Sequence, residues 1–280
     1  MEDDEDLIPT ASTKPSSNKG KAYADELENI HLLHVAVGTM HTIWGLIFAT
    51  LVAAIDDVAH VKTYLLRSAW YSSEPEVEYQ GSVALGAVSA SYHFISALFH
   101  LVCFFRVKDY EVRLVEHRNS LRWWHYRIVF ALQSSYLACV CGVDETRVIA
   151  VCSLVTFLQY GLLSYTDTCD KSERRLLLPF IECGFAVLFK WGLISSSLFG
   201  SGSTVPVSAV VAWALGLAFD ILISLNQYMY TTERSFSTNV TFPFRDAFNW
   251  KHATTAEQWF ILLEAVSLTF STWSTMSMVV

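Results

Sequence analysis

Long apolar runs, separated by polar connections, make up most of this chain after its first 29 residues. A helix that crosses a membrane needs about 20 mostly apolar residues. Seven segments reach that length: 31–54, 82–105, 123–143, 147–166, 176–199, 205–230 and 258–280. Each is too long for an ordinary strand, and a helix satisfies its own backbone hydrogen bonds inside the bilayer. The pattern predicts an all-α membrane protein, a bundle of seven transmembrane helices.

Composition agrees with an integral membrane protein. The chain is 52% hydrophobic and only 16% charged, whereas soluble domains have about 25% charged residues. The net charge of −8 comes largely from acidic residues near the amino terminus. We therefore expect the lipid bilayer as the main partner and no nucleic-acid partner. The length of the spans does not distinguish a plasma, internal or viral membrane.

The chain divides into a short tail and one membrane domain. Residues 1–29 are polar and acidic and predict a disordered tail, and residues 30–280 hold the seven spans. The connection from 55 to 81 is long and aromatic, so we expect it to pack as a lid. The six cysteines lie mostly in apolar runs, without the spacing of a disulfide framework or a zinc site. No metal site and no cofactor are expected.

Basic residues in the connections predict the orientation of the bundle. Lysines and arginines concentrate on the cytoplasmic side of membrane proteins. The tail and the connections after the second, fourth and sixth spans carry 14 of them, and the other connections carry 3. The amino terminus is therefore expected inside. Seven spans then put the carboxyl terminus outside.

Several ionisable residues lie inside the predicted spans, where a charge costs about 2.5–3.5 kcal/mol. Each is a candidate for a functional site, although a neutral histidine can also simply hydrogen-bond a neighbouring helix. Lys190 needs a partner, and the sequence offers Asp220, Glu182 or Glu264. The remaining candidates are histidines: His34, His41, His93, His100 and His125.

The second span pairs serine with histidine four residues later, as Ser89 with His93 and Ser96 with His100. Such pairs share a helical face and resemble a motif of intramembrane zinc hydrolases. Those enzymes also carry two histidines four apart in the seventh helix, and this chain has no histidine there. We therefore expect no catalytic residues and no enzymatic activity.

A set of motifs in the same order resembles the heliorhodopsin family over nearly the whole chain outside the tail. The third span begins Arg-Trp-Trp-His-Tyr at 122–126, similar to the family's Arg-Trp-x-Glu-Tyr. The other marks are Met40-His41, the run Ser96 to His100, Trp191, Leu225-Asn226-Gln227-Tyr228, and a seventh span with Glu257 and Trp273. The resemblance implies a rhodopsin-like bundle with the amino terminus inside, and a homodimer.

Two departures from the family concern its chromophore. The family holds retinal as a Schiff base on a helix 7 lysine five residues before a tryptophan, with a helix 3 glutamate as counterion. Counting back from Trp273 gives Leu268, and the counterion position is His125. Because leucine cannot form an imine, we expect no covalent retinal at the usual position. Lys190 is the one lysine left within the spans and the alternative attachment point.

Glu264 lies one turn before Leu268 and should face the same pocket as His125. We therefore predict a polar pair of His125 and Glu264, which either passes or senses protons or simply joins two helices. Three functions stay open: a sensory protein with an apolar ligand near Leu268, Trp191 and Trp273; a structural or interaction subunit; and an ion pathway. The pathway would use His125, Glu264, Lys190 and Asp220, with Glu182 and His93 as further polar candidates, whereas His41 and His100 are candidates for lining the ligand pocket.

Overall fold

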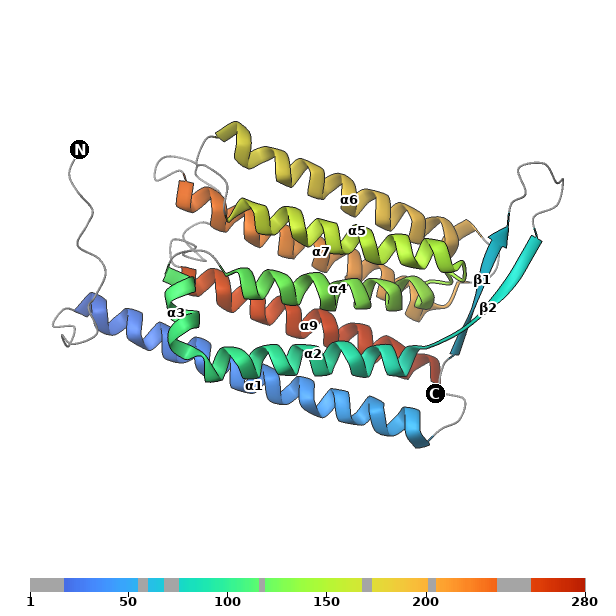
Figure 1. Cartoon of the computed structure of the whole chain (residues 1–280), viewed down its shortest axis with the longest axis horizontal. Coiled ribbons are helices and arrows are strands. Elements are labelled where there is room, and N and C mark those ends of the chain that lie inside the picture. The colour runs from blue at the N-terminus through green and yellow to red at the C-terminus, as the bar shows by residue number, and fades with distance from the viewer. Residues whose placement is uncertain are drawn as a thin grey trace.

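A computed structural model describes residues 18–54, 60–67, 76–115, 119–167, 173–200, 205–235 and 253–279. Within these residues seven long helices lie side by side along the length of the molecule (Figure 1). They are α1 Asn18–Ala54, α2 Leu85–Phe105, α4 Ser120–Val140, α5 Thr146–Thr166, α6 Glu173–Gly200, α7 Val207–Ser235 and α9 Ala253–Val279. The predicted helical bundle is thus confirmed.

Six of the seven helices begin and end within five residues of the predicted bounds, and α1 is the exception. It begins at Asn18, thirteen residues before the predicted start of the first span. Residues 18–29 are therefore helical, and the prediction that they are disordered is wrong. The rest of the predicted tail, residues 1–17, lies outside the described residues.

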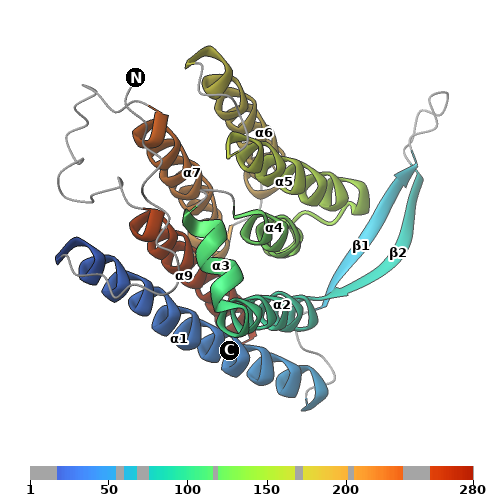
Figure 2. The same ribbon diagram turned by 60° about the vertical axis from the view of Figure 1, so that its left-hand side comes forward.

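The connection between α1 and α2 contains a β-hairpin, which the all-α prediction missed. Strands β1 His60–Arg67 and β2 Glu76–Ala84 pair antiparallel, with an irregularity where Thr63 faces Gly81 and Tyr64 faces Tyr79. The extra residue between those two pairs is accommodated by Gly81, whose φ of +143° favours glycine. The hairpin projects from one end of the bundle (Figures 1 and 2) instead of covering it as a lid.

A short helix, α3 Val107–Val115, lies across the opposite end of the bundle (Figure 2). The sequence analysis took these residues as part of a connection. Tyr110 and Leu114 are buried in a small core with Ile30 of α1 and Ala256 of α9. α3 therefore closes the end at which α4 and α9 begin.

Five helices are long and apolar enough to cross a membrane, judged by length and composition within the described residues. These stretches are Asp25–Ala54, Leu85–Phe105, Thr146–Thr166, Leu177–Gly200 and Val207–Thr231. α4 and α9 carry more polar residues. α4 lies in the middle of the bundle (Figure 2) and contacts α2, α5, α7 and α9. A helix enclosed by others can hold polar groups because those groups bond its neighbours and do not face lipid.

The main core is built on α4 and is rich in aromatic rings. Tyr126 packs edge-on against Tyr160 of α5 and Phe260 of α9, with ring centroids 5.8 and 6.1 Å apart. Its hydroxyl donates to the backbone oxygen of Phe260 over 2.7 Å. Tyr136, one heptad and a turn further along α4, donates in the same way to the backbone of Ser271. The two tyrosines thus fix α9 against α4 at two levels.

Prediction for Gly216. A Cβ at this position of α7 would lie 2.5 Å from the Trp191 ring of α6 and 2.9 Å from Leu137 Cδ1 of α4. We expect Gly216→Ala to destabilise the bundle by about 1–3 kcal/mol, the usual cost of overpacking. Thermal unfolding of the purified protein in detergent measures the effect. The control is Gly192→Ala on α6, where nothing lies within 4 Å. Equal unfolding temperatures for the two variants would contradict the prediction.

Candidate functional site

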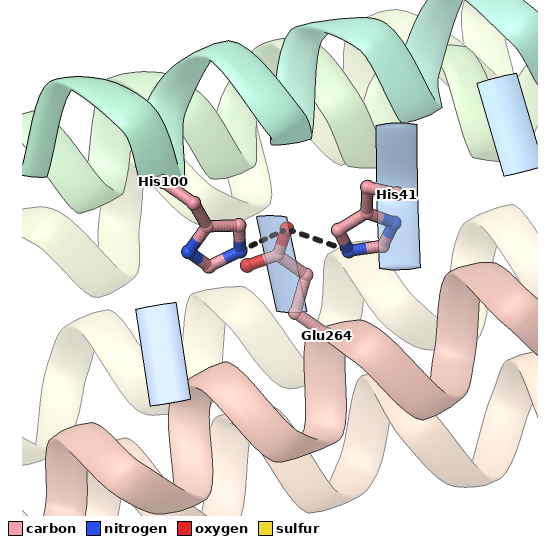
Figure 3. A group of neighbouring side chains, drawn as sticks. All are labelled: His41, His100 and Glu264. Carbon is pink, nitrogen blue, oxygen red and sulfur yellow. Dashed lines mark ion pairs between the residues drawn. The ribbon is translucent and has the colours of Figure 1, made fainter. Parts of the chain in front are cut away.

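Four helices bring one glutamate and three histidines to a common point inside the bundle. Oε1 of Glu264 on α9 lies 3.8 Å from His41 Nε2 of α1, 3.7 Å from His100 Nε2 of α2 and 3.3 Å from His125 Nε2 of α4. All four side chains are at most 2% exposed. Figure 3 shows His41 and His100 pointing at the same carboxylate from two sides. We call Glu264, His41, His100 and His125 the His–Glu cluster.

Two further histidines contact the outer ring nitrogens of His41 and His100. His93 Nδ1 lies 2.8 Å from His41 Nδ1, and His34 Nδ1 lies 2.7 Å from His100 Nδ1. His93 also uses Nε2, which lies 2.7 Å from the Thr272 hydroxyl of α9. Two of the three rings that face Glu264, those of His41 and His100, are therefore held in place by a second histidine ring.

The spacing of the histidines explains why they meet. His34 and His41 are seven residues apart on α1, and His93 and His100 are seven apart on α2. Seven residues are close to two helical turns, so each pair lies on one face of its helix. At Gly38, between the two α1 histidines, an added Cβ would lie only 3.0 Å from His100 Cβ. Glycine thus permits the close approach of α1 and α2 that joins the two faces.

Four of the inner atoms of the His–Glu cluster have no hydrogen-bond partner within the described structure. These atoms are Nε2 of His41, Nε2 of His100 and both carboxylate oxygens of Glu264. A buried polar group without a partner costs about 1–3 kcal/mol, and more when it is charged. A protein that carries four such atoms at one point gains by placing a proton or a cation between them.

A second buried cluster lies between α6 and α7, and its charges are paired. Lys190 Nζ donates to Asp220 over 2.5 Å, and the indole nitrogen of Trp191 donates to the same carboxylate over 2.6 Å. Gln159 and Tyr160 of α5 lie 3.4 Å from its other oxygen. Of the partners that the sequence offered for Lys190, the structure selects Asp220.

The space beside the Lys190–Asp220 pair is nearly filled. The cavity there has a volume of only about 10 Å³ and is lined by Trp191, Gln133, Ser267 and other side chains of α4, α6, α7 and α9. That volume holds about one water molecule. Leu268, which neighbours Ser267, is completely buried in the main core. The cavity that Trp191 lines among the described residues is therefore too small for a large apolar ligand.

A third network ties α4 to the ends of α3, α5 and α9. Arg122, counted above among the connection cations, is 3% exposed and pairs with Glu257. Its other terminal nitrogen lies 3.8 Å from Asp167 at the end of α5. Tyr110 of α3 donates to Glu257 over 2.7 Å. Burial and the neighbouring Glu257 carboxylate raise the pKa of Tyr110 well above its usual value, so this hydroxyl stays protonated.

Two predicted site residues lie outside these clusters. Trp273 of α9 is 58% exposed, so the prediction that it lines a pocket is wrong. Glu182 is exposed on α6 and does not pair with Lys190. His125 and Glu264 do meet, as the sequence predicts, and Ser96 Oγ lies 3.1 Å from the same His125 nitrogen. The sequence analysis missed the roles of His34, Thr272 and Arg122, although the seven-residue histidine spacing was a visible signal.

A comparison with known proteins identifies the family of this chain. The sequence model of the family named Heliorhodopsin matches residues 30–279, which is nearly the whole chain. The chain belongs to the heliorhodopsin family. Among individually curated proteins, none matches it. This member of the family is an integral membrane protein of the rhodopsin-like type, and its apolar helices agree with that environment.

Prediction for the Lys190–Asp220 pair. Breaking a buried ion pair leaves one charge uncompensated, which costs about 3–5 kcal/mol. We expect Lys190→Met and Asp220→Asn each to lower the unfolding temperature strongly. The double variant Lys190→Met/Asp220→Asn should lose less than the sum of both, because it buries no unpaired charge.

The matched control is Asp109→Asn, which removes an exposed pair with Arg106 at 4.0 Å. Exposed pairs contribute about 0–1 kcal/mol, so its unfolding temperature should hardly change. Additive losses in the double variant would show that Lys190 and Asp220 do not stabilise one another.

Proposed function

We propose that this heliorhodopsin family member holds no retinal as a Schiff base and acts as a non-photochemical, non-enzymatic sensory membrane protein. One observation carries the proposal: a carboxylate, and no amine, faces the counterion position. His125 stands where the family has its glutamate, and the α9 side chain in contact with it is Glu264, at 3.3 Å. The basic and acidic partners of the family's pair have exchanged helices.

The position that corresponds to the family's retinal-binding lysine can be located in two ways, and both lead to a residue without an amine. Counting back from Trp273 gives Leu268, but Trp273 is exposed and is a weak reference point. Contact with His125 selects Glu264, one turn earlier. We infer that Glu264 occupies the lysine position. Neither carboxylate nor leucine can form an imine with retinal.

Lys190, the alternative attachment point, is poorly suited to imine formation. Its ammonium group is committed to Asp220 at 2.5 Å and to Gln159 at 3.5 Å. Imine formation at Lys190 would require its nitrogen to leave Asp220 and Gln159. Ligand pockets usually measure about 300–1,000 Å³, whereas the adjacent cavity measures about 10 Å³. The residues present therefore do not fit a retinal chromophore.

The proposal includes seven transmembrane helices with the amino terminus inside. α4 and α9 are less apolar than the five helices that qualify by composition, but their polar side chains bond each other inside the bundle. α1 begins and α9 ends at opposite ends of the bundle (Figure 1), as an odd number of crossings requires. The excess of basic residues on the side of the amino terminus supports the orientation. The family resemblance adds a homodimer to the proposal.

The same observations rank the functions left open by the sequence. The small volume of the cavity beside Trp191 argues against an apolar ligand there. The unpartnered inner atoms of the His–Glu cluster favour a binding role with a small polar or ionic ligand. A purely structural role is the second candidate, favoured by the paired Lys190 and Asp220. The ion pathway ranks last, since the Lys190–Asp220 cluster and the His–Glu cluster share no residue.

Prediction for retinal. We expect no visible absorption band from the folded, monodisperse protein after expression with all-trans retinal. The physical reason is that the α9 side chain facing His125 is Glu264, which carries no amine. The measurement is an absorption spectrum before and after hydroxylamine. A family member that keeps its helix 7 lysine, treated identically, serves as the positive control.

A band that hydroxylamine bleaches would overturn the proposal. In that case the variant Lys190→Met would identify the attachment point. Loss of the band in this variant would mean that Lys190 leaves Asp220 to bind the chromophore.

A further inference from the structure

The four buried carboxylates of the described structure differ in whether an arginine or a lysine pairs with them. Asp167 and Glu257 share the guanidinium of Arg122, and Asp220 has Lys190. Glu264 is completely buried, and its ion-pair partners among the described residues are all histidines. A carboxyl group enclosed in this way must either hold a proton or have a positive charge close by. Within the described residues, the protein itself does not supply a permanent one.

One hydrogen-bond arrangement around His93 leaves a lone pair of His41 facing Glu264 when both rings are neutral. In this arrangement Thr272 donates its one hydroxyl proton to Leu268 O over 2.8 Å, and its oxygen accepts from Tyr92 and from His93 Nε2. His93 then carries its proton on Nε2, and its Nδ1 accepts from His41 Nδ1. The Nε2 atom of His41 is left with a lone pair that faces Glu264. Two electron-rich atoms therefore face one another without a hydrogen between them.

We propose that His41, His100 and Glu264 form a binding site for a divalent first-row transition metal ion, with His125 in reach as a fourth ligand. One ligand atom from each of the first three residues lies within 4.8 Å of the others. A tetrahedral site with bonds of about 2.0–2.2 Å places its ligand atoms about 3.3 Å apart. The observed 3.7 and 3.8 Å are slightly wider. The edge between His41 and His100 is at most 4.8 Å, so binding requires the side chains to rotate inward.

The surroundings match those of known metal sites. A histidine that binds a metal through one ring nitrogen usually donates a hydrogen bond from the other, and the acceptor fixes the orientation of the ring. His93 Nδ1 is such an acceptor for His41 at 2.8 Å, and His34 Nδ1 lies 2.7 Å from His100 Nδ1. Imidazole with carboxylate suits zinc and its neighbours, whereas magnesium and calcium prefer oxygen ligands alone.

The site joins three helices that are far apart in sequence. His41 lies on α1, His100 on α2 and Glu264 on α9, so a bound ion would pull these helices together. This inference names the ligand class of the sensory role and rests on the proposed binding function. It stays independent of the retinal experiment, because a protein without a chromophore can bind the metal or fail to bind it.

Prediction for the metal site. The full-length protein, treated with EDTA and freed of it, should bind one Zn²⁺ per chain by isothermal titration calorimetry and unfold at a higher temperature with Zn²⁺. Glu264→Gln and His100→Gln should each weaken binding by at least about 100-fold, since each removes a direct ligand. His93→Leu should weaken it by about 10–100-fold, the usual effect of an outer partner. The matched control is His31→Gln, which removes an outlying histidine paired with Glu111 at 3.1 Å and should leave binding unchanged.

Co²⁺ provides a readout that needs no variant. Bound at this site it should give the intense visible bands of a four-coordinate ion with nitrogen ligands, and Zn²⁺ should displace it. Absence of saturable binding by folded protein, equal affinity in Glu264→Gln and the unaltered chain, or the weak spectrum of an octahedral all-oxygen site would each overturn the proposal. If the variants fail to fold, the Co²⁺ spectrum alone decides.

Discussion

Pairing of buried charge is the constraint on which the rest of this bundle depends. In a medium of low dielectric constant an unpaired carboxylate is too costly to keep, so each one must find a partner on another helix. Arg122 serves two acids where α4 begins, and Lys190 serves Asp220 between α6 and α7. These pairs set which helices are neighbours. They also explain why the central helix α4 is less apolar than the helices around it.

Glu264 departs from that rule, and the candidate site follows from the departure. Its neighbours are histidines, which can be neutral, so the local charge depends on what else is bound. The Lys190–Asp220 cluster, by contrast, is complete without any ligand. The same bundle thus contains a closed polar cluster that holds helices together and an open one that is suited to respond to its surroundings.

In the proposed function, the acidic and basic partners of the family's Schiff-base pair have exchanged places between α4 and α9. A lysine on one helix and a glutamate on the other support a Schiff base and its counterion. With Glu264 and His125 at the contact, an acid and a base still face one another across α4 and α9. In the proposed function this contact is preserved as a packing feature, and the chromophore chemistry is not.

The sequence by itself determined the helical bundle, the approximate bounds of its seven long helices and which ionisable residues lie within those spans, because length and hydrophobicity are local properties. It also predicted the pair of His125 with Glu264, since both positions follow from helical periodicity and the family motif. Only the tertiary structure decided the rest: that Lys190 chooses Asp220, that Trp273 faces outward and that Arg122 is buried. The rotation of each helix about its axis, and the neighbours that it meets, come from packing between distant segments. For that reason the meeting of His41, His100 and Glu264 at one point appears only in three dimensions.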